Sequence, residues 1–158
     1  MLDPFKYEDN DGYQLTSALT SIGNGGLTGK GLGNGLAKLG YLPEPHTDFI
    51  FTVISEELGL LGVLFTLAIY GYILIKGLIY ANKTDNQFYK LICVGVVSYI
   101  FMQVFINLAG VSSIIPLTGV TLPLLSYGGS SMLSISIAFG ALLAVARRIN
   151  NDRKETLK

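Results

Sequence analysis

The sequence predicts an all-α integral membrane protein with three transmembrane helices and a large extracellular glycine-rich loop region. Half of its 158 residues are hydrophobic and 14% are charged, against about 25% charged residues in a typical soluble protein. Residues 91–146 contain no Asp, Glu, Lys, Arg or His, a length well beyond the about 20 residues of one span. A soluble helical core is the disfavoured alternative, because a chain this small would not cover so much uncharged sequence.

Composition also excludes several classes of site. Acidic and basic residues balance at 11 each, so no bulk basic surface predicts a nucleic-acid partner. The single cysteine, Cys93, excludes an internal disulfide and a cysteine metal cluster. Acidic residues crowd positions 1–11, whereas a cleavable signal peptide begins with a basic and then an apolar region. We therefore expect the chain's own spans to insert it into the membrane.

The first predicted element is a short amphipathic helix at residues 13–22. Its apolar residues recur at helical spacing with polar residues between them; they are Leu15, Ala18, Leu19 and Ile22. Such a helix packs on neighbouring helices or lies on the membrane surface, and its short length favours packing.

Residues 23–35 form the richest glycine run, G-N-G-G-L-T-G-K-G-L-G-N-G. The run is not a Walker A loop, which needs glycine where Asn24 stands and Ser or Thr where Gly31 stands. Its alternating glycines also fail the dinucleotide spacing. Two interpretations stay open: the run approaches a phosphate ligand closely, with Lys30 as a point charge, or it is a flexible external loop with a solvated lysine.

The first 47 residues are predicted to form the extracellular loop region, and residues 48–158 the membrane region. At the boundary, Pro43 and Pro45 favour an extended approach. Thr47 or Asp48 can then accept a hydrogen bond from the first free amides of a helix. The alternative role for Asp48 is catalytic, because a carboxylate at the outer membrane boundary can accept a proton from a substrate hydroxyl. The residues alone favour the cap.

Three more acids surround this boundary. Glu44 is close in sequence, and Glu56 lies two helical turns after Asp48, about 12 Å deeper at about 1.5 Å per residue. A carboxylate within a span is costly. Glu56 and Glu57 are therefore expected to face the protein interior or the edge of a cavity, with hydrogen-bond partners.

The three spans are predicted at about residues 49–78, 90–112 and 127–148. Gln103 and Asn107 share one face of the second span, which suits an interhelical hydrogen bond better than a ligand contact. The third span carries two ladders of small residues that allow close helix approach. The ladders are Ser130, Ser134 and Ala138, and Ser136, Gly140 and Ala144.

The connection between the second and third spans is not a continuous helix. Five helix-breaking residues interrupt it, namely Pro116, Gly119, Pro123, Gly128 and Gly129. Irregular backbone at membrane depth is tolerated only against protein or a wet cavity. We expect this connection to form a second wall of an outward-facing site.

Basic residues set the predicted orientation. Lys76, Lys83 and Lys90 flank the connection between the first two spans, and a basic tail begins at Arg147. Both of these ends are expected to face the cytoplasm. Residues 1–47 and the connection at 113–127 then lie outside.

Four motifs together resemble those of the shape, elongation, division and sporulation (SEDS) family of bacterial membrane proteins. They are G-K-G-L-G at 29–33, L-P-E-P-H-T-D-F-I-F at 42–51, E-E-L-G at 56–59 and P-L-T-G-V-T-L-P-L-L-S-Y-G-G-S-S at 116–131. Their order and spacing match through essentially the whole chain. The T-L-P at 121–123 resembles the division branch more than the elongation branch. Members have about ten spans, so the chain resembles the C-terminal part of a polytopic bundle.

The resemblance implies a peptidoglycan glycosyltransferase that polymerises lipid II during cell division, at the outer face of the bacterial cytoplasmic membrane. The implied partners are a class B penicillin-binding protein, which crosslinks the glycan, other divisome membrane proteins, and membrane lipid. Asp48 matches the family's catalytic aspartate and would deprotonate the 4-hydroxyl of the acceptor sugar, which reverses the preference for a cap. The implied substrate-binding residues are Lys30, Glu44, His46, Thr118 and Ser126.

The donor sugar would leave with its pyrophosphate, whose charge is neutralised by a basic side chain, with Lys30 as the candidate, or by a divalent cation such as Mg²⁺ or Mn²⁺. Some family members carry a basic residue where this chain has Thr118 and an acid where Gly40 stands, so those charges are absent here. A lipid II transporter and a non-catalytic division scaffold are the alternative functions. The chain is expected to be inactive by itself, because the helices that complete the lipid cavity are missing.

Overall fold

The computed structural model describes residues 11–35, 48–116 and 118–156, and this part of the chain folds into helices and loops without a strand. The helices are α1 (Asp11–Gly25), α2 (Ile50–Asn82), α3 (Gln87–Val111) and α4 (Gly129–Thr156). The last three are each long and apolar enough to cross a membrane. The predicted all-α membrane fold is therefore confirmed, and its three spans begin within about three residues of their predicted starts.

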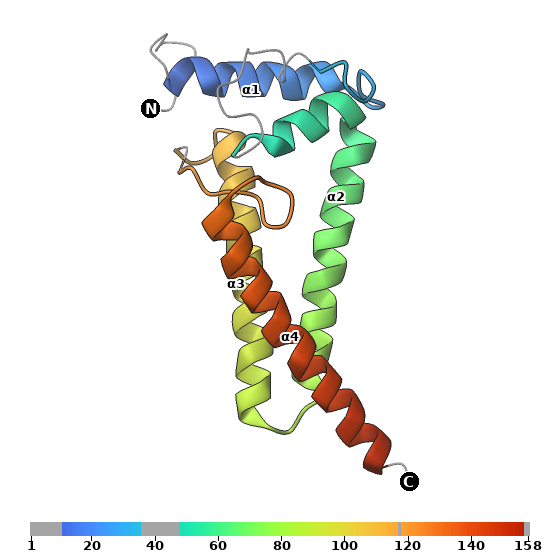
Figure 1. Ribbon diagram of the computed structural model, residues 1–158. Helices are drawn as coiled ribbons and strands as arrows, with labels where there is room; N and C mark the ends of the chain where they lie inside the picture. Colours follow the sequence, from blue (N-terminus) through green and yellow to red (C-terminus); the bar gives the residue numbers. More distant parts are fainter. Residues whose placement is uncertain (1–10, 36–47, 117, 157–158) are drawn as a thin grey trace.

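The amphipathic helix α1 lies across one end of the other three helices (Figure 1). It is longer than predicted and packs on α2 and α3. Ala18 and Ser21 are buried. Ile22 packs against a hydrophobic cluster, here called the upper core, whose buried residues include Phe49, Ile100 and Leu122. The apolar face of α1 therefore packs on neighbouring helices, the use that its short length favoured.

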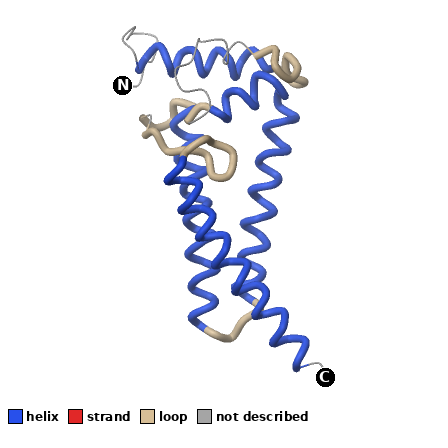
Figure 2. Tube along the Cα trace, in the orientation of Figure 1, coloured by secondary structure: helices blue, strands red, loops and turns tan. Residues whose placement is uncertain are grey.

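A sharp break at Gly59 divides α2 into two segments. Gly59 has φ 66° and ψ −161°, a combination of positive φ and extended ψ that essentially only glycine adopts. Residues 50–58 run across the molecule beneath α1, and residues 60–82 run along its length (Figure 2). The long segment spans about 34 Å at about 1.5 Å per residue, enough for a hydrocarbon core of about 30 Å.

The break corrects the predicted depth of Glu56. A continuous helix would have placed this residue about 12 Å below Asp48. Because residues 50–58 lie across the molecule, Glu56 stays at the same end of the bundle as α1 (Figure 1). The prediction was wrong because hydropathy does not detect a backbone break within an otherwise helical pattern.

The long segment of α2 and the antiparallel α3 are joined by a short turn. Asn86 caps α3 by accepting a hydrogen bond from the Phe88 amide at 2.9 Å. The α4 helix crosses this pair diagonally (Figure 1). A lower core lies where the three helices meet; it contains Ala81, Cys93, Leu142, Val145 and Ile149.

The small-residue ladders of α4 make no close helix contact within the described part of this chain, and their use as helix contacts stays a prediction. Ser134, Ser136, Gly140 and Ala144 are all exposed, and a Cβ on Gly140 would meet nothing within 4 Å. Within this chain α4 packs instead through larger residues such as Ile135. Bulky side chains gain more from burial than small ones.

The two ends of the bundle differ in content. One end holds α1, the glycine-rich loop, the transverse segment of α2 and the α3–α4 connection, and the other holds the α2–α3 turn and the C-terminal part of α4 (Figure 1). Near the second end, the ammonium of Lys76 lies over the Tyr72 ring at 5.4 Å and that of Lys83 over the Tyr80 ring at 5.7 Å. The segments predicted to lie outside and those predicted to be cytoplasmic are thus at opposite ends of the bundle, and which end faces the cytoplasm stays a prediction.

Candidate functional site

Asp48 lies directly before the transverse segment of α2 and is half-buried. The N-cap of α2 is the following residue, Phe49, whose carbonyl accepts the Thr52 amide at 2.9 Å. The prediction that Thr47 or Asp48 occupies the cap position is therefore wrong by at least one residue. The buried Phe49 ring sets the start of the helix by anchoring in the upper core.

Asn107 of α3 joins the chain at Asp48 to the α3–α4 connection. Its side-chain Nδ2 donates to the Asp48 carbonyl oxygen at 2.9 Å and to the Val120 carbonyl oxygen at 2.7 Å. The side chain is 3% exposed. The prediction of an interhelical hydrogen bond is wrong for these bonds of Asn107, because its acceptors are main-chain carbonyls of two segments outside the helices.

A shallow depression, here called the pocket, lies beside Asp48; its empty volume of about 160 Å³ includes open solvent, and the described residues around it enclose no room for a water molecule. Its lining comes from the start of α2, from α3 and from the α3–α4 connection, namely Asp48, Ile106, Asn107, Gly110, Thr118, Gly119 and Val120. The connection therefore forms a wall of the pocket that holds Asp48, as the sequence predicted. The space beside an acid that is only half-buried is where a substrate hydroxyl can reach a carboxylate.

Gly119 lets the carboxylate of Asp48 approach the connection. It has φ 66°, and a Cβ at this position would lie 3.4 Å from Asp48 Oδ2. A side chain here would be strained and would take up space at the acid. Gly119 was recognised in the sequence as a helix breaker but not as a residue of the site.

The rest of the connection is held by internal hydrogen bonds. Ser126 is buried, and its Oγ accepts the Leu122 amide at 2.8 Å while its own amide donates to the Leu122 carbonyl at 3.0 Å. The Tyr70 hydroxyl of α2 donates to the Pro123 carbonyl. Ser126 thus closes a turn and lies outside the pocket lining, so its predicted role in substrate binding has no support from this geometry.

The glycine-rich loop closes the break in α2. The Lys30 and Gly31 amides donate to the Glu56 and Glu57 carbonyls at 3.0 Å each, and the Leu60 amide donates to the Gly26 carbonyl at 3.0 Å. Carbonyls at the end of one helix segment and amides at the start of the next lack helical partners. The loop supplies partners to both sets.

Two glycines of this run, Gly25 and Gly29, are needed for close contact with the backbone of α2. Gly29 has φ 76°, and a Cβ there would overlap the Glu57 carbonyl group. A Cβ on Gly25 would overlap the Ser55 carbonyl, and one on Gly59 would overlap the Gly29 amide. The docked loop contradicts the interpretation of a flexible loop, and its closest backbone approach is to its own helix.

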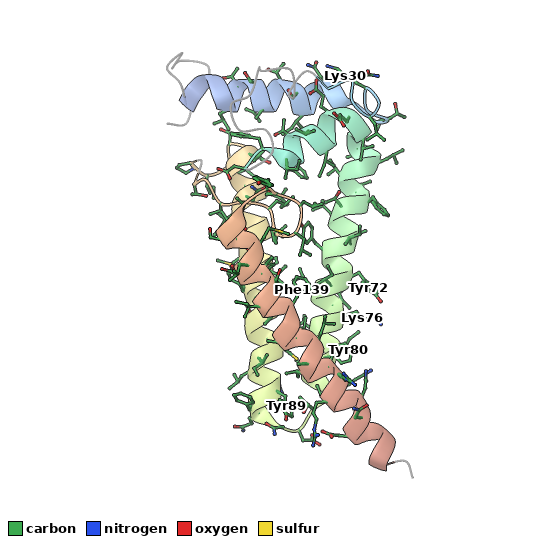
Figure 3. All side chains as sticks on the ribbon, viewed as in Figure 1. Lys30, Tyr72, Lys76, Tyr80, Tyr89 and Phe139 are labelled. Carbon is green, nitrogen blue, oxygen red and sulfur yellow. The ribbon has the colours of Figure 1, made fainter. Side chains whose placement is uncertain are left out.

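Lys30 and Glu56 form an ion pair where the loop meets the transverse segment. Lys30 Nζ lies 2.8 Å from Glu56 Oε1, with side-chain exposures of 31% and 0%, and Figure 3 shows Lys30 beside the loop end of α1. Glu56 therefore faces the interior with a partner, as predicted, and Glu57 is also buried. The interpretation of Lys30 as a solvated lysine is wrong, because a buried carboxylate needs a compensating charge.

The predicted substrate-binding residues fall in different places. Thr118 lines the pocket and is exposed, whereas Lys30 meets Glu56 at the docked loop. Glu44 and His46 lie outside the described residues. In the described part of the chain, no group of three His, Cys, Asp or Glu side chains is placed to hold a metal ion. Asn107, which lines the pocket, is the main residue of the site that the sequence did not assign to it.

Comparison with known families gives a match along nearly the whole chain. A protein-family model for FtsW, RodA and SpoVE, described as "Cell cycle protein", matches residues 1–151. The chain is similar to the probable peptidoglycan glycosyltransferase FtsW of Bacillus subtilis (strain 168), with 46% identity over 98% of this chain and 40% of that protein. It is also similar to stage V sporulation protein E of the same organism, with 43% identity over 92% and 40% of the two chains.

Two solved structures share the fold. One, described as "Structural coordination of polymerization and crosslinking by a peptidoglycan synthase complex", matches with a TM-score of 0.74 and 30% identity over 92% of this chain and 39% of the other. The second is a variant of the Thermus thermophilus rod shape determining protein RodA, with a TM-score of 0.63 and 35% identity over 82% and 39%. The chain thus spans about two fifths of the length of the relatives it matches.

Proposed function

This chain belongs to the FtsW, RodA and SpoVE family, and from that premise we propose that it carries the catalytic acid of a peptidoglycan glycosyltransferase that polymerises lipid II during cell division. The observation that supports this proposal is the position of Asp48, a half-buried carboxylate against Gly119 at the wall of an open pocket. The relatives named FtsW supply the reaction class.

In this proposal Asp48 is the general base. Its carboxylate takes the proton from the 4-hydroxyl of the acceptor sugar, and that oxygen forms a bond to the anomeric carbon of the donor as the bond from this carbon to pyrophosphate breaks. A base must lie within hydrogen-bond reach of the proton it removes. The open pocket beside Asp48, with exposed Thr118 at its edge, offers a place for that hydroxyl.

The leaving pyrophosphate needs neutralising charge. A divalent cation, Mg²⁺ or Mn²⁺, would supply that charge when bound, but the described pocket residues do not fit one by themselves. Lys30 already directs one of its three N–H donors to Glu56. Its charge is thereby compensated within the fold. Among the described pocket residues, Asp48 is the single carboxylate, so this proposal derives no step through a metal.

The proposed setting is the outer face of the bacterial cytoplasmic membrane. The three apolar helices support membrane insertion, and the basic residues near the α2–α3 turn support a cytoplasmic position for the opposite end of the bundle. A class B penicillin-binding protein is the proposed partner. One similar structure is described as a synthase complex that coordinates polymerization and crosslinking, which supports this choice.

The test is replacement of Asp48 by Asn in the full-length protein, followed by a glycan polymerisation assay with lipid II. The expected result is loss of glycan synthesis with retained binding of the partner, because the amide cannot take the proton. Asp85→Asn is the matched control, since Asp85 is an exposed acid in the α2–α3 turn, and it should leave synthesis unchanged. Unchanged synthesis by the Asp48→Asn protein would refute Asp48 as the base, whereas no synthesis by the wild-type protein would leave a transporter or a scaffold as the function.

A further inference from the structure

The buried amide of Asn107 connects the two walls of the pocket. The Asp48 carbonyl belongs to one wall of the pocket and the Val120 carbonyl to the other, and Asn107 Nδ2 donates to both. A single primary amide has two N–H donors, and here each donor holds one wall.

The orientation of this amide follows from its surroundings. Turning it over would place Oδ1 against two carbonyl oxygens, which are acceptors only, so Nδ2 must face them. Oδ1 is then buried and has no hydrogen-bond partner in the described part of the chain. Leaving a buried acceptor unpaired lowers stability. An amide at this core position therefore lowers the stability of the fold. Its contribution to the structure is the two hydrogen bonds that Nδ2 donates.

Neither wall has a regular hydrogen-bond ladder of its own to fix its position. Asp48 precedes the first turn of α2, and the connection contains positive φ angles at Ser113, Gly119 and Leu124. Asn107 lies instead in the interior of α3, whose backbone is fixed by helical hydrogen bonds. A side chain on this rigid element can set the separation of two irregular segments.

We propose that Asn107 is a positioning residue that holds Asp48 at the correct separation from the Thr118–Val120 wall, so that the carboxylate meets the acceptor sugar hydroxyl in the pocket. This inference rests on the proposed glycosyltransferase function. Asn107 acts through the backbone of residue 48 and of Val120 rather than on the substrate. A misplaced base lowers the rate of the chemical step more than it lowers substrate binding.

The experiment compares Asn107→Ala and Asn107→Asp with the wild-type full-length protein. Asp keeps the size of Asn but removes both N–H donors. The matched control is Gln103→Ala, because Gln103 lies one turn earlier on α3 and outside the pocket lining. Initial rates of glycan synthesis are measured against lipid II concentration, and the folded fraction is measured by thermal unfolding in detergent.

Both Asn107 variants should lower kcat by about 10- to 100-fold with KM within about twofold of the wild type, when rates are expressed per folded molecule. The Gln103 control should keep its kcat. The proposal fails if kcat per folded molecule is unchanged, or if both variants unfold where the control stays folded, because the amide would then serve the fold alone.

The same assay separates this inference from the proposed function. If Asp48→Asn is inactive while both Asn107 variants are fully active, Asp48 remains the base and the positioning role is refuted. If Asp48→Asn is active, the proposed function fails, and the positioning role fails with it. Each result therefore supports or refutes the positioning role of Asn107.

Discussion

Two irregular, glycine-containing regions lie at the same end of the bundle and use glycine in opposite ways. In the docked loop, residues 23–35, glycines bring backbone against the broken part of α2, and amides and carbonyls meet across the contact. In the α3–α4 connection, Gly119 instead leaves space beside the Asp48 carboxylate. A high glycine content therefore does not by itself predict ligand binding. In the docked loop, the backbone of α2 fills the space beside the glycines, whereas no backbone from the described residues fills the space beside Gly119.

The docked loop and the α3–α4 connection also differ in the charged groups that they contact. The docked loop contains a complete ion pair between Lys30 and fully buried Glu56. At the pocket, Asp48 is half-buried and its carboxylate lies beside Gly119. The first arrangement is suited to holding structure and the second to meeting a substrate.

The largest expected effect is on the docked loop. Gly29→Ala should reduce the free energy of unfolding by about 4 kcal/mol or more, because the new methyl group overlaps the Glu57 carbonyl and φ 76° is strained for alanine. Thermal unfolding in detergent measures this loss. Gly23→Ala is the control, since its Cβ meets nothing within 4 Å. Equal stability of the two variants would refute the close docking.

Breaking the ion pair should have the next largest effect. Lys30→Met leaves Glu56 buried without its cation and should cost about 3 kcal/mol of stability. Adding Glu56→Gln should restore part of that loss, because a neutral amide is less costly to bury. Denaturant titration of the single and double variants checks this coupling. Arg148→Met, which breaks an exposed pair with Asp152, should change stability by less than about 1 kcal/mol.

A smaller effect is expected from the turn in the connection. Ser126→Ala removes the acceptor of the buried Leu122 amide and should cost about 1–2 kcal/mol. Ser136→Ala is the matched control on exposed α4 surface and should be nearly neutral in the same unfolding measurement. If Ser126→Ala instead weakens lipid II binding without a loss of stability, Ser126 contacts substrate rather than closing the turn.

The smallest change in stability is expected at the pocket, where activity should respond most. Gly119→Ala places a methyl group 3.4 Å from Asp48 Oδ2 at φ 66° and should cost about 1 kcal/mol. We expect glycan synthesis per folded molecule to fall by at least about tenfold, because a displaced base reacts slowly. Synthesis and unfolding are measured on the same preparation. If glycan synthesis and stability fall in parallel, Gly119 serves the fold as the docked-loop glycines do, and the proposed difference between the two regions is refuted.

The sequence predicted the features that depend on composition and periodicity. Uncharged runs located the three spans, and Pro and Gly residues located the irregular connection that lines the pocket. The burial of Glu56 also followed from the cost of an exposed or unpaired carboxylate near the membrane. These inferences needed only local patterns and general energetics.

Long-range pairing was harder to predict. Lys6, Lys30 and Lys38 all precede Glu56 in the sequence, and spacing alone does not choose the lysine that reaches it. The break at Gly59 lies in E-E-L-G, which continues a helical hydrophobic pattern, so its positive φ leaves no trace in hydropathy. A hydrogen bond from Asn107 was predicted, but its acceptors are main-chain carbonyls. Every residue has a main-chain carbonyl, so the sequence does not indicate which ones accept.

The hydrogen bonds across the α2 break also join segments that unfold separately in most proteins. The loop amides of Lys30 and Gly31 donate to α2, and the Leu60 amide donates back to the loop. Opening the loop therefore exposes both helix ends at once, so α1, the loop and the start of the long span form one cooperative unit. The Lys30 and Gly31 amides should consequently exchange with solvent deuterium as slowly as those of the helix to which they are bound.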